Sequence, residues 1–434
     1  MKYRTILLLG LLWIVITGCT PLVQAVQPAQ TGSVELDAQH SVGQTFVARY
    51  AGLSAILVNL SPGKAGDGEL VLHLRADVWA KEDLVRVVLP LSQVTQAGQY
   101  RFNFYPLSNS NQAYYYAMWE LIGSGSLGVG AAASNAYQDG ALYQQGTARD
   151  GQLAFSLEYD AGQLASGLVK ELTRWVAVLA LAGLIFITPG WAMLGWLWPG
   201  WDDLSWFGRL GLAGGFSLAA YAVLLVFTGL AGLQLGAWYA WGALILALGS
   251  LVWQVLIRRR RDRRAPPTAA PSQRTGQLLS TRLADGAFVV VLLLIVVTRW
   301  WAVRSIEAPM WGDSVHHTVI AQLILDHGGL FESWQPYAAY GSFSNQFGFP
   351  ASAALLSWVS GMEAPQAVLW GGQVLNVMAL LVLYPLAVRM AKGQHWAGVG
   401  AVFAAGLIAT MPAFYFNWGR YAQLAGQVIL PVVI

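Results

Sequence analysis

Six long apolar segments constrain the fold of this 434-residue chain more than any other feature. A helix of about 20 apolar residues is long enough to cross the hydrocarbon core of a bilayer, which is about 30 Å thick. Such segments occupy residues 175–197, 207–230, 236–257, 287–303, 366–388 and 396–414. Only 11% of the residues are charged and 56% are hydrophobic, which excludes an ordinary soluble protein. We therefore expect a polytopic helical membrane protein.

A further apolar segment begins near Leu424 and runs to the last residue, Ile434. A membrane span normally has a polar flank at each end. On this basis we expect the sequence to be the amino-terminal part of a longer protein.

A basic segment supplies the predicted orientation. Residues 258–264 read RRRRDRR and are followed by a stretch rich in Pro, Ala, Ser and Thr as far as about Thr281. Lys and Arg accumulate in cytoplasmic loops, and a stretch of this composition does not bury a core. We expect residues 258–281 to be a cytoplasmic linker. Nucleic acid is not an expected partner, because a basic run at a helix end is typically a topology signal.

Counting spans from this linker places residue 174 and everything before it, together with the loop 304–350, outside the cytoplasm. The amino terminus agrees, because Lys2 and Arg4 precede a short apolar core and the sequence Ile16-Thr-Gly-Cys19. Residues 1–19 are predicted to be a signal peptide or a lipoprotein signal with Cys19 as the lipidated residue. A signal anchor with an incidental cysteine is the alternative. The predicted location is the bacterial cell membrane, and one cysteine permits no intramolecular disulfide.

Residues 33–160 alternate between apolar and polar side chains, as in 44–50, 69–75 and 100–105. Alternation is typical of β-strands, and roughly eight such segments separated by turns predict an extracytoplasmic β-sandwich of jelly-roll type. Tyr114, Tyr115, Tyr116 and Trp119 are either stacking faces for a sugar or packing residues of the sandwich. The domain order continues with a three-span bundle at 175–257, the linker, and a second membrane region at 285–434.

The loop 304–350 concentrates titratable and aromatic residues. Within it, residues 315–327 have helical spacing and are followed by Gly328 and Gly329, a typical helix end. Asp313 therefore lies at a helix start. Either Asp313 or Ser314 caps this helix, or the Asp313 carboxylate takes a proton from a substrate hydroxyl.

Asp313 and His316 are three residues apart and are weak candidates for metal ligands, because two ligands without a recognised spacing do not define a site. No cofactor is assigned, and a divalent metal remains an alternative.

The order of these parts resembles the GT-C superfamily of integral membrane glycosyltransferases, which includes protein O-mannosyltransferases and aminoarabinose transferases. The resemblance covers about residues 285–434. It rests on an outward span at 287–303, an acid early in the next outer loop in Trp311-Gly-Asp-Ser314, a helix at 316–325, an aromatic-Pro-Tyr stretch at 328–340, and a short helix near 351–360. The sequence Phe416-Asn-Trp-Gly-Arg-Tyr-Ala-Gln423 also matches an aromatic-Gly-Arg-Tyr loop of bacterial members.

This resemblance implies transfer of a sugar from a polyprenyl-phosphate donor to an envelope glycan, lipid or protein. Asp313 matches the catalytic acid of the family, and Arg420 is the candidate for the donor phosphate. The remaining candidates for substrate binding are His316, His317, Trp334, Tyr337, Tyr340 and Tyr421. The sequence departs from the family in having Ser314 after the acid and three spans before the matching region.

Two other functions stay open. A membrane-anchored glycan-binding protein would use the sandwich, although one span would suffice to anchor it. A polysaccharide or lipid transporter would place ionisable groups within its spans, and these spans carry almost none away from their ends.

Overall fold

The computed structural model describes residues 22–133, 136–262, 275–304, 306–341 and 346–433. The chain divides into two compact units, Met1–Thr173 and Arg174–Ile434. The predicted signal segment with Cys19 and residues 263–274 of the predicted linker lie outside the described residues.

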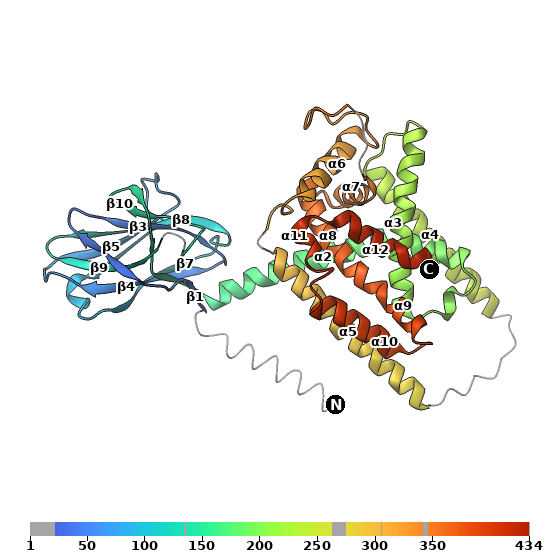
Figure 1. Ribbon diagram of the computed structural model, residues 1–434, viewed down its shortest axis with the longest axis horizontal. Helices are drawn as coiled ribbons and strands as arrows, with labels where there is room; N and C mark the ends of the chain where they lie inside the picture. Colours follow the sequence, from blue (N-terminus) through green and yellow to red (C-terminus); the bar gives the residue numbers. More distant parts are fainter. Residues whose placement is uncertain (1–21, 134–135, 263–274, 305, 342–345, 434) are drawn as a thin grey trace. The chain divides into compact units, whose positions relative to one another are not determined.

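The first unit contains two antiparallel sheets, as the alternation predicted (Figure 1). In the seven-stranded sheet the order is β1-β13-β4-β9-β12, with β2 paired to β9 and β7 paired to β4. Its strands are β1 (Leu22–Gln27), β2 (Gly32–Asp37), β4 (Leu53–Pro62), β7 (Gly98–Leu107), β9 (Ser126–Ala132), β12 (Gln152–Leu153) and β13 (Phe155–Tyr159). The strands therefore start at Leu22, earlier than the predicted boundary.

The six-stranded sheet has the order β11-β10-β3-β8-β5-β6. Its strands are β3 (Val42–Ala48), β5 (Glu69–Arg75), β6 (Val85–Pro90), β8 (Ala113–Ile122), β10 (Leu142–Gln144) and β11 (Thr147–Arg149). Strands β3 and β5 both pair with β8, which is therefore central in its sheet. A 3₁₀ turn, η2 (Leu91–Gln93), follows β6.

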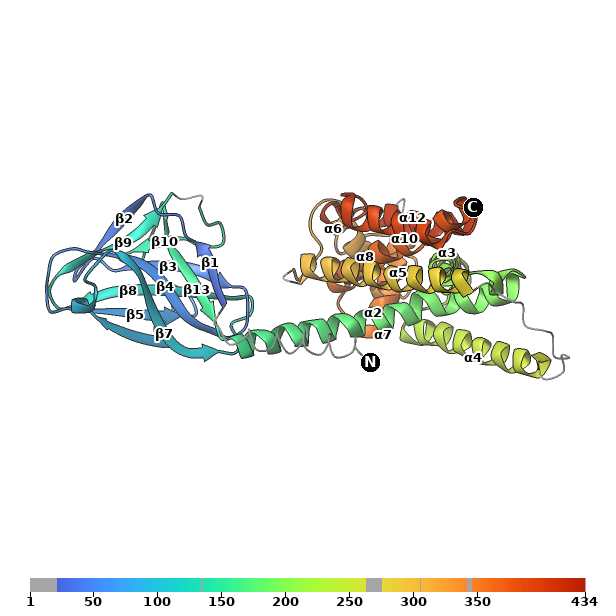
Figure 2. The ribbon, with the colours of Figure 1, turned by 90° about the horizontal axis from the view of Figure 1, so that it is seen from below.

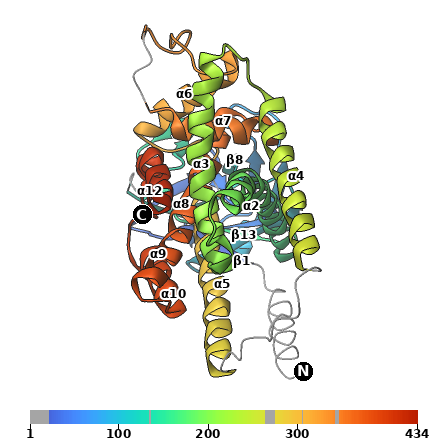
Figure 3. The same cartoon turned by 90° about the vertical axis from the view of Figure 1, so that its right-hand side faces the viewer.

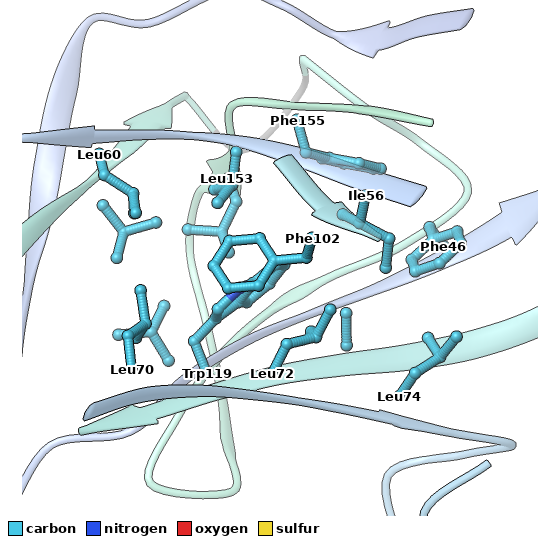
Figure 4. Close-up of a cluster of buried hydrophobic side chains, with 14 of the residues drawn as sticks. Phe46, Ile56, Leu60, Leu70, Leu72, Leu74, Phe102, Trp119, Leu153 and Phe155 are labelled. Atoms are coloured by element: carbon cyan, nitrogen blue, oxygen red, sulfur yellow. The ribbon is translucent and has the colours of Figure 1, made fainter. Parts of the chain in front are cut away.

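Both sheets contribute to one hydrophobic core, which makes the first unit a sandwich (Figure 4). Trp119 of β8 meets Phe102 of β7 with ring centroids 6.2 Å apart, and Phe46 of β3 meets Phe155 of β13 at 5.7 Å. Each pair joins one sheet to the other. Aromatic contacts of this kind contribute beyond the area they bury.

The aromatic run on β8 is mainly structural. Tyr115 and Trp119 face the core, and Tyr116 is buried against Tyr143 at a centroid distance of 5.4 Å. The packing interpretation is confirmed for these three residues. Tyr114 is the exposed member of the run.

The second unit is helical. Its elements are α2 (Ala161–Leu197, which begins in the first unit), η3 (Trp201–Asp203), α3 (Trp206–Leu230), α4 (Ala237–Asp262), α5 (Thr275–Val303), α6 (Asp313–His327), α7 (Gly348–Ser360), α8 (Ala364–Leu381), α9 (Leu383–Met390), α10 (His395–Phe403), the π-helix η4 (Ala404–Ile408), α11 (Tyr415–Trp418) and α12 (Tyr421–Val433). Among the described residues, five helical segments are long and apolar enough to cross a membrane: 161–197, 206–230, 237–260, 280–303 and 364–390.

The sixth predicted span, 396–414, is wrong in extent. The helix formed by α10 and η4 ends at Ile408, and Ala409 has an extended backbone conformation. Pro412 lacks a backbone N–H and disfavours helix at the residue before it, which opposes continuation of the apolar run as one helix. The last apolar helix, α12, begins at Tyr421 instead of near Leu424.

Helix α8 is the centre of the second unit. Most of its apolar stretch is buried, whereas α4 buries little and lies at the edge of the helical unit (Figures 2 and 3). Gly372 of α8 leaves room for the ring of Tyr421, the first residue of α12, because a β-carbon at Gly372 would collide with that ring. This close approach brings the first residue of α12 directly against α8.

Candidate functional site

A pocket of about 430 Å³ lies where the first turns of α6 and α12 meet. The described residues that line it are Asp313, His316, His317, Ile320, Gln346, Arg420, Ala422 and Gln423. Four of the predicted site residues, Asp313, His316, His317 and Arg420, are therefore brought together from two distant parts of the sequence.

An ion pair joins the two parts. Arg420 Nη1 lies 3.2 Å from Asp313 Oδ2, and the two side chains are 47% and 50% exposed. A pair exposed to this degree contributes only about 0–1 kcal/mol to stability, since water and salt screen it. Both charged groups remain accessible to a ligand in the pocket.

Asp313 is the first residue of α6 but does not cap it. Gly312 occupies the cap position, and no side chain of the described residues makes a cap hydrogen bond there. Ser314 Oγ instead donates to the carbonyl of Met310 at 2.6 Å. The capping alternative is therefore wrong for both residues. Trp311, just before the helix, has a φ of 56°, and a non-glycine residue in the left-handed region is a form of strain found at functional sites.

The backbone of Arg420 is positioned by a hydrogen bond to Tyr415 and by the buried residue that follows it, Tyr421. Its backbone N–H donates to the carbonyl of Tyr415 at 3.0 Å, and Gly419 before it turns the chain with a φ of 67°. Tyr421 after it is fully buried, with its ring 4.9 Å from that of Phe349. Tyr421 does not line the pocket. The prediction that it binds substrate is corrected: its burial makes it a packing residue that anchors α12.

His317 is 7% exposed and lines the pocket. Burial lowers its pKa to about 4, and the nearby Asp313 carboxylate and the backbone of Gly419 offset only part of this effect. The imidazole is therefore neutral at physiological pH. Its Nδ1 is buried and has no hydrogen-bond partner within the described part of the chain, which leaves an unsatisfied polar atom beside the pocket.

His316 is exposed and also lines the pocket. Within the described ranges, no group of three or more His, Cys, Asp or Glu side chains is arranged to hold a metal ion. The carboxylate of Asp313 has Arg420 as its charged partner instead. The described residues therefore supply no third His, Cys, Asp or Glu ligand for a metal ion bound by Asp313 and His316.

The three aromatic candidates of the loop 304–350 lie elsewhere. Trp334 is buried, with its ring 5.9 Å from Phe331 and 5.6 Å from Tyr340. Tyr337 is half-exposed and its hydroxyl donates to Asp326 Oδ2 at 3.1 Å. None of the three is among the described residues that line the pocket. The structure therefore does not bring them to the Asp313–Arg420 pair, and the burial of Trp334 is that of a core residue.

Gln346 and Gln423 are pocket residues that sequence reasoning missed. Gln423 is the last residue of the 416–423 motif, and its membership of that motif was the available sequence signal. Gln346 precedes α7 in a stretch without a distinctive pattern.

No model of a known protein family matches the chain, and no curated protein is detectably similar to it.

Proposed function

We propose that this protein is a membrane glycosyltransferase of GT-C type that moves a sugar from a polyprenyl-phosphate donor to an acceptor outside the cytoplasm. The observation that supports it best is the 3.2 Å pairing of Asp313 with Arg420 in a pocket that also contains two histidines. The resemblance assigns the catalytic acid and the phosphate ligand to these two residues, and a transfer reaction needs both at one site.

In the proposed reaction an acceptor hydroxyl attacks the anomeric carbon of the donor sugar. The bond between that carbon and the phosphate oxygen breaks, and polyprenyl phosphate leaves with the bonding electrons. Asp313 takes the hydroxyl proton, as a positioned carboxylate can. Arg420 offers a planar set of donors to the phosphate oxygens. The neutral imidazole of His317 forms part of the wall of the same pocket.

In the proposed topology the sandwich, of jelly-roll type, and the pocket lie outside the cytoplasm, in a bacterial cell membrane. Two features support a common membrane face for the α2–α3 connection and the end of α4, and the basic run at 258–264 favours the cytoplasmic side for it. Asp202 pairs with Arg209 at 3.2 Å and with Arg258 at 2.7 Å. Trp191, Trp198, Trp201 and Trp206 cluster at the same connection, and tryptophan is enriched at membrane interfaces.

The test is sugar transfer by the purified protein in liposomes, with a panel of polyprenyl-phosphate sugars and a mixture of envelope acceptors. We expect Asp313→Asn to abolish transfer, because the amide cannot accept the proton. Asp326→Asn is the matched control, since Asp326 is an acid of the same helix that bonds Gln322 and Tyr337 outside the pocket.

Full activity of Asp313→Asn would overturn the assigned role. Absence of turnover by the folded wild type would favour the glycan-binding or transport alternatives.

A further inference from the structure

A buried arginine lies within one of the candidate spans. Arg299 belongs to the apolar stretch Ser280–Val303 of α5 and is 6% exposed. Arg299 lies four residues before the end of that stretch, and a buried charge is costly unless it is paired or hydrogen-bonded. Arg299 is not among the described residues that line the Asp313 pocket.

The guanidinium of Arg299 donates in three directions. Nε donates to Asn376 Oδ1 at 2.8 Å, Nη1 to Thr298 Oγ1 at 3.1 Å, and Nη2 to the carbonyl of Gly406 at 3.0 Å. Gly406 lies in the π-helix η4, where the shifted hydrogen-bond pattern is typical of functional sites. Arg299 thus joins α5, α8 and the irregular end of the α10 helix.

Asn376 links Arg299 to Pro412. It is fully buried in α8, and while its Oδ1 accepts from Arg299, its Nδ2 donates to the carbonyl of Pro412 at 2.7 Å. Both ends of the amide are in use. A buried network in which each member is satisfied makes the local structure rigid.

From Pro412 the hydrogen bonds continue to the pocket. The carbonyl of Pro412 also accepts from the backbone N–H of Tyr415 at 3.1 Å, and the carbonyl of Tyr415 accepts from the backbone N–H of Arg420 at 3.0 Å. Arg420 then pairs with Asp313. Consecutive contacts therefore lead from Arg299 of α5 to the ion pair.

We propose that Arg299 and Asn376 are positioning residues that fix the segment 409–420 and thereby hold the guanidinium of Arg420 at the pocket. Neither residue touches the pocket itself. The effect on the segment follows from the hydrogen bonds alone, whereas the effect on catalysis rests on the proposed function.

The chemistry of asparagine gives a sharp test. Asn376→Asp keeps an acceptor for Arg299 and adds an opposite charge, but it removes the donor to Pro412. The contact between α5 and α8 is therefore retained while the link to the segment is cut. Thr298→Val is the matched control, because it removes one hydrogen bond of Arg299 that does not lead to Pro412.

Hydrogen exchange of the complete chain in detergent measures the first effect without any substrate. We expect residues 412–423 to exchange faster in Asn376→Asp and in Arg299→Lys, and at the wild-type rate in Thr298→Val. Arg299→Lys serves as the second variant should Asn376→Asp fail to fold. Unchanged exchange in this segment in the folded variant would overturn the proposal.

Kinetics measure the second effect. Misplacement of a binding group by about 1 Å can cost about 100-fold in rate, so we expect kcat/KM for the donor to fall at least about tenfold in Asn376→Asp, mainly through KM. A general loss of folded protein would lower kcat instead. Faster exchange with unchanged kcat/KM would overturn the positioning role. Faster exchange in Asn376→Asp, together with no sugar transfer by the folded wild type, would refute the proposed function and leave the structural link intact.

Discussion

Gly419 lies so close to Ser314 that a β-carbon on Gly419 would collide with the backbone nitrogen and the hydroxyl of Ser314. Asp313 immediately precedes Ser314, and Arg420 immediately follows Gly419. The absence of a side chain at Gly419 therefore permits the approach that forms the ion pair. The φ of 67° at Gly419 is also one that L-residues other than glycine rarely adopt.

Gly419→Ala is expected to disrupt this approach. The left-handed conformation costs an alanine about 1–2 kcal/mol, and the collision adds a cost of similar size, so we expect a lower melting temperature together with loss of transfer. Thermal unfolding in detergent and the transfer assay measure the two effects. Gly426→Ala is the control, because an added β-carbon there would meet no atom within 4 Å apart from its chain neighbours and the backbone of its own helix. Wild-type melting and activity in Gly419→Ala would contradict the prediction.

Arg420→Gln separates activity from stability. Both members of the ion pair are about half exposed, so the free energy of unfolding should change by no more than about 1 kcal/mol. Loss of the guanidinium should raise KM for a polyprenyl-phosphate donor, and Arg420→Lys should restore part of the affinity as a single point charge. Steady-state kinetics with varied donor tests this. Arg389→Gln, at an exposed arginine outside the pocket, should behave as wild type.

His317 gives the protein a predictable sensitivity to acid. Its pKa falls from the ordinary 6.5 to about 4 in the folded protein because it is buried. Between these values the unfolded chain binds the proton and the folded one does not, so stability is lost as the pH falls below about 6.5 and the loss levels off near pH 4. This difference in pKa corresponds to about 3 kcal/mol.

The measurement is the apparent melting temperature of wild type and His317→Gln from pH 7 to pH 4. We expect the variant to lose less stability on acidification, because it lacks the buried group that must stay neutral. His316→Gln, at the exposed neighbour, should follow the wild-type profile. Parallel profiles for wild type and His317→Gln would show that His317 becomes protonated without cost.

Local patterns predicted the elements of this fold well. Alternation predicted the sandwich strands, and five of the six complete apolar segments correspond to helices long enough to span a membrane. Apolar composition failed at 396–414, where Pro412 and a π-helix end the helix early. Hydropathy does not record the backbone hydrogen bonds that a proline removes.

The site was predictable only in part. The family pattern predicts site roles for Asp313 and Arg420, and the structure places them 3.2 Å apart. Tyr421 and Trp334, aromatic residues in or near the matching motifs, are both buried. The sequence specifies the chemistry of a side chain, but whether that side chain faces the pocket or the core depends on how its segment packs. The role of Asn376 has no local signal, since it depends on contacts with Arg299 and Pro412 from distant segments.

The proposed orientation predicts which residues are accessible from outside the cell. Tyr340 and Met390 are both exposed, and they should lie on opposite sides of the membrane. In a background where the single cysteine, Cys19, is replaced by serine, Tyr340→Cys should react with a membrane-impermeant thiol reagent in intact cells. Met390→Cys should react only after the cells are opened. The reverse pattern would place the pocket in the cytoplasm.

Gln373 should be a site where stability can be raised. It is fully buried in α8, one turn before Asn376, and neither its Oε1 nor its Nε2 has a hydrogen-bond partner within the described part of the chain. An unsatisfied buried polar group costs about 1–3 kcal/mol. Gln373→Leu has a similar volume and removes both orphan atoms, so we expect a higher melting temperature in detergent.

For Asn376→Leu, in the same helix, we expect the melting temperature to change in the opposite direction. It removes the partners of Arg299 and of the Pro412 carbonyl and leaves a buried charge with less compensation, so the melting temperature should fall. The contrast between the two variants isolates hydrogen bonding from burial, because both residues are fully buried. A lower melting temperature for Gln373→Leu would mean that its amide binds a water molecule or another group whose loss costs more than the orphan atoms do.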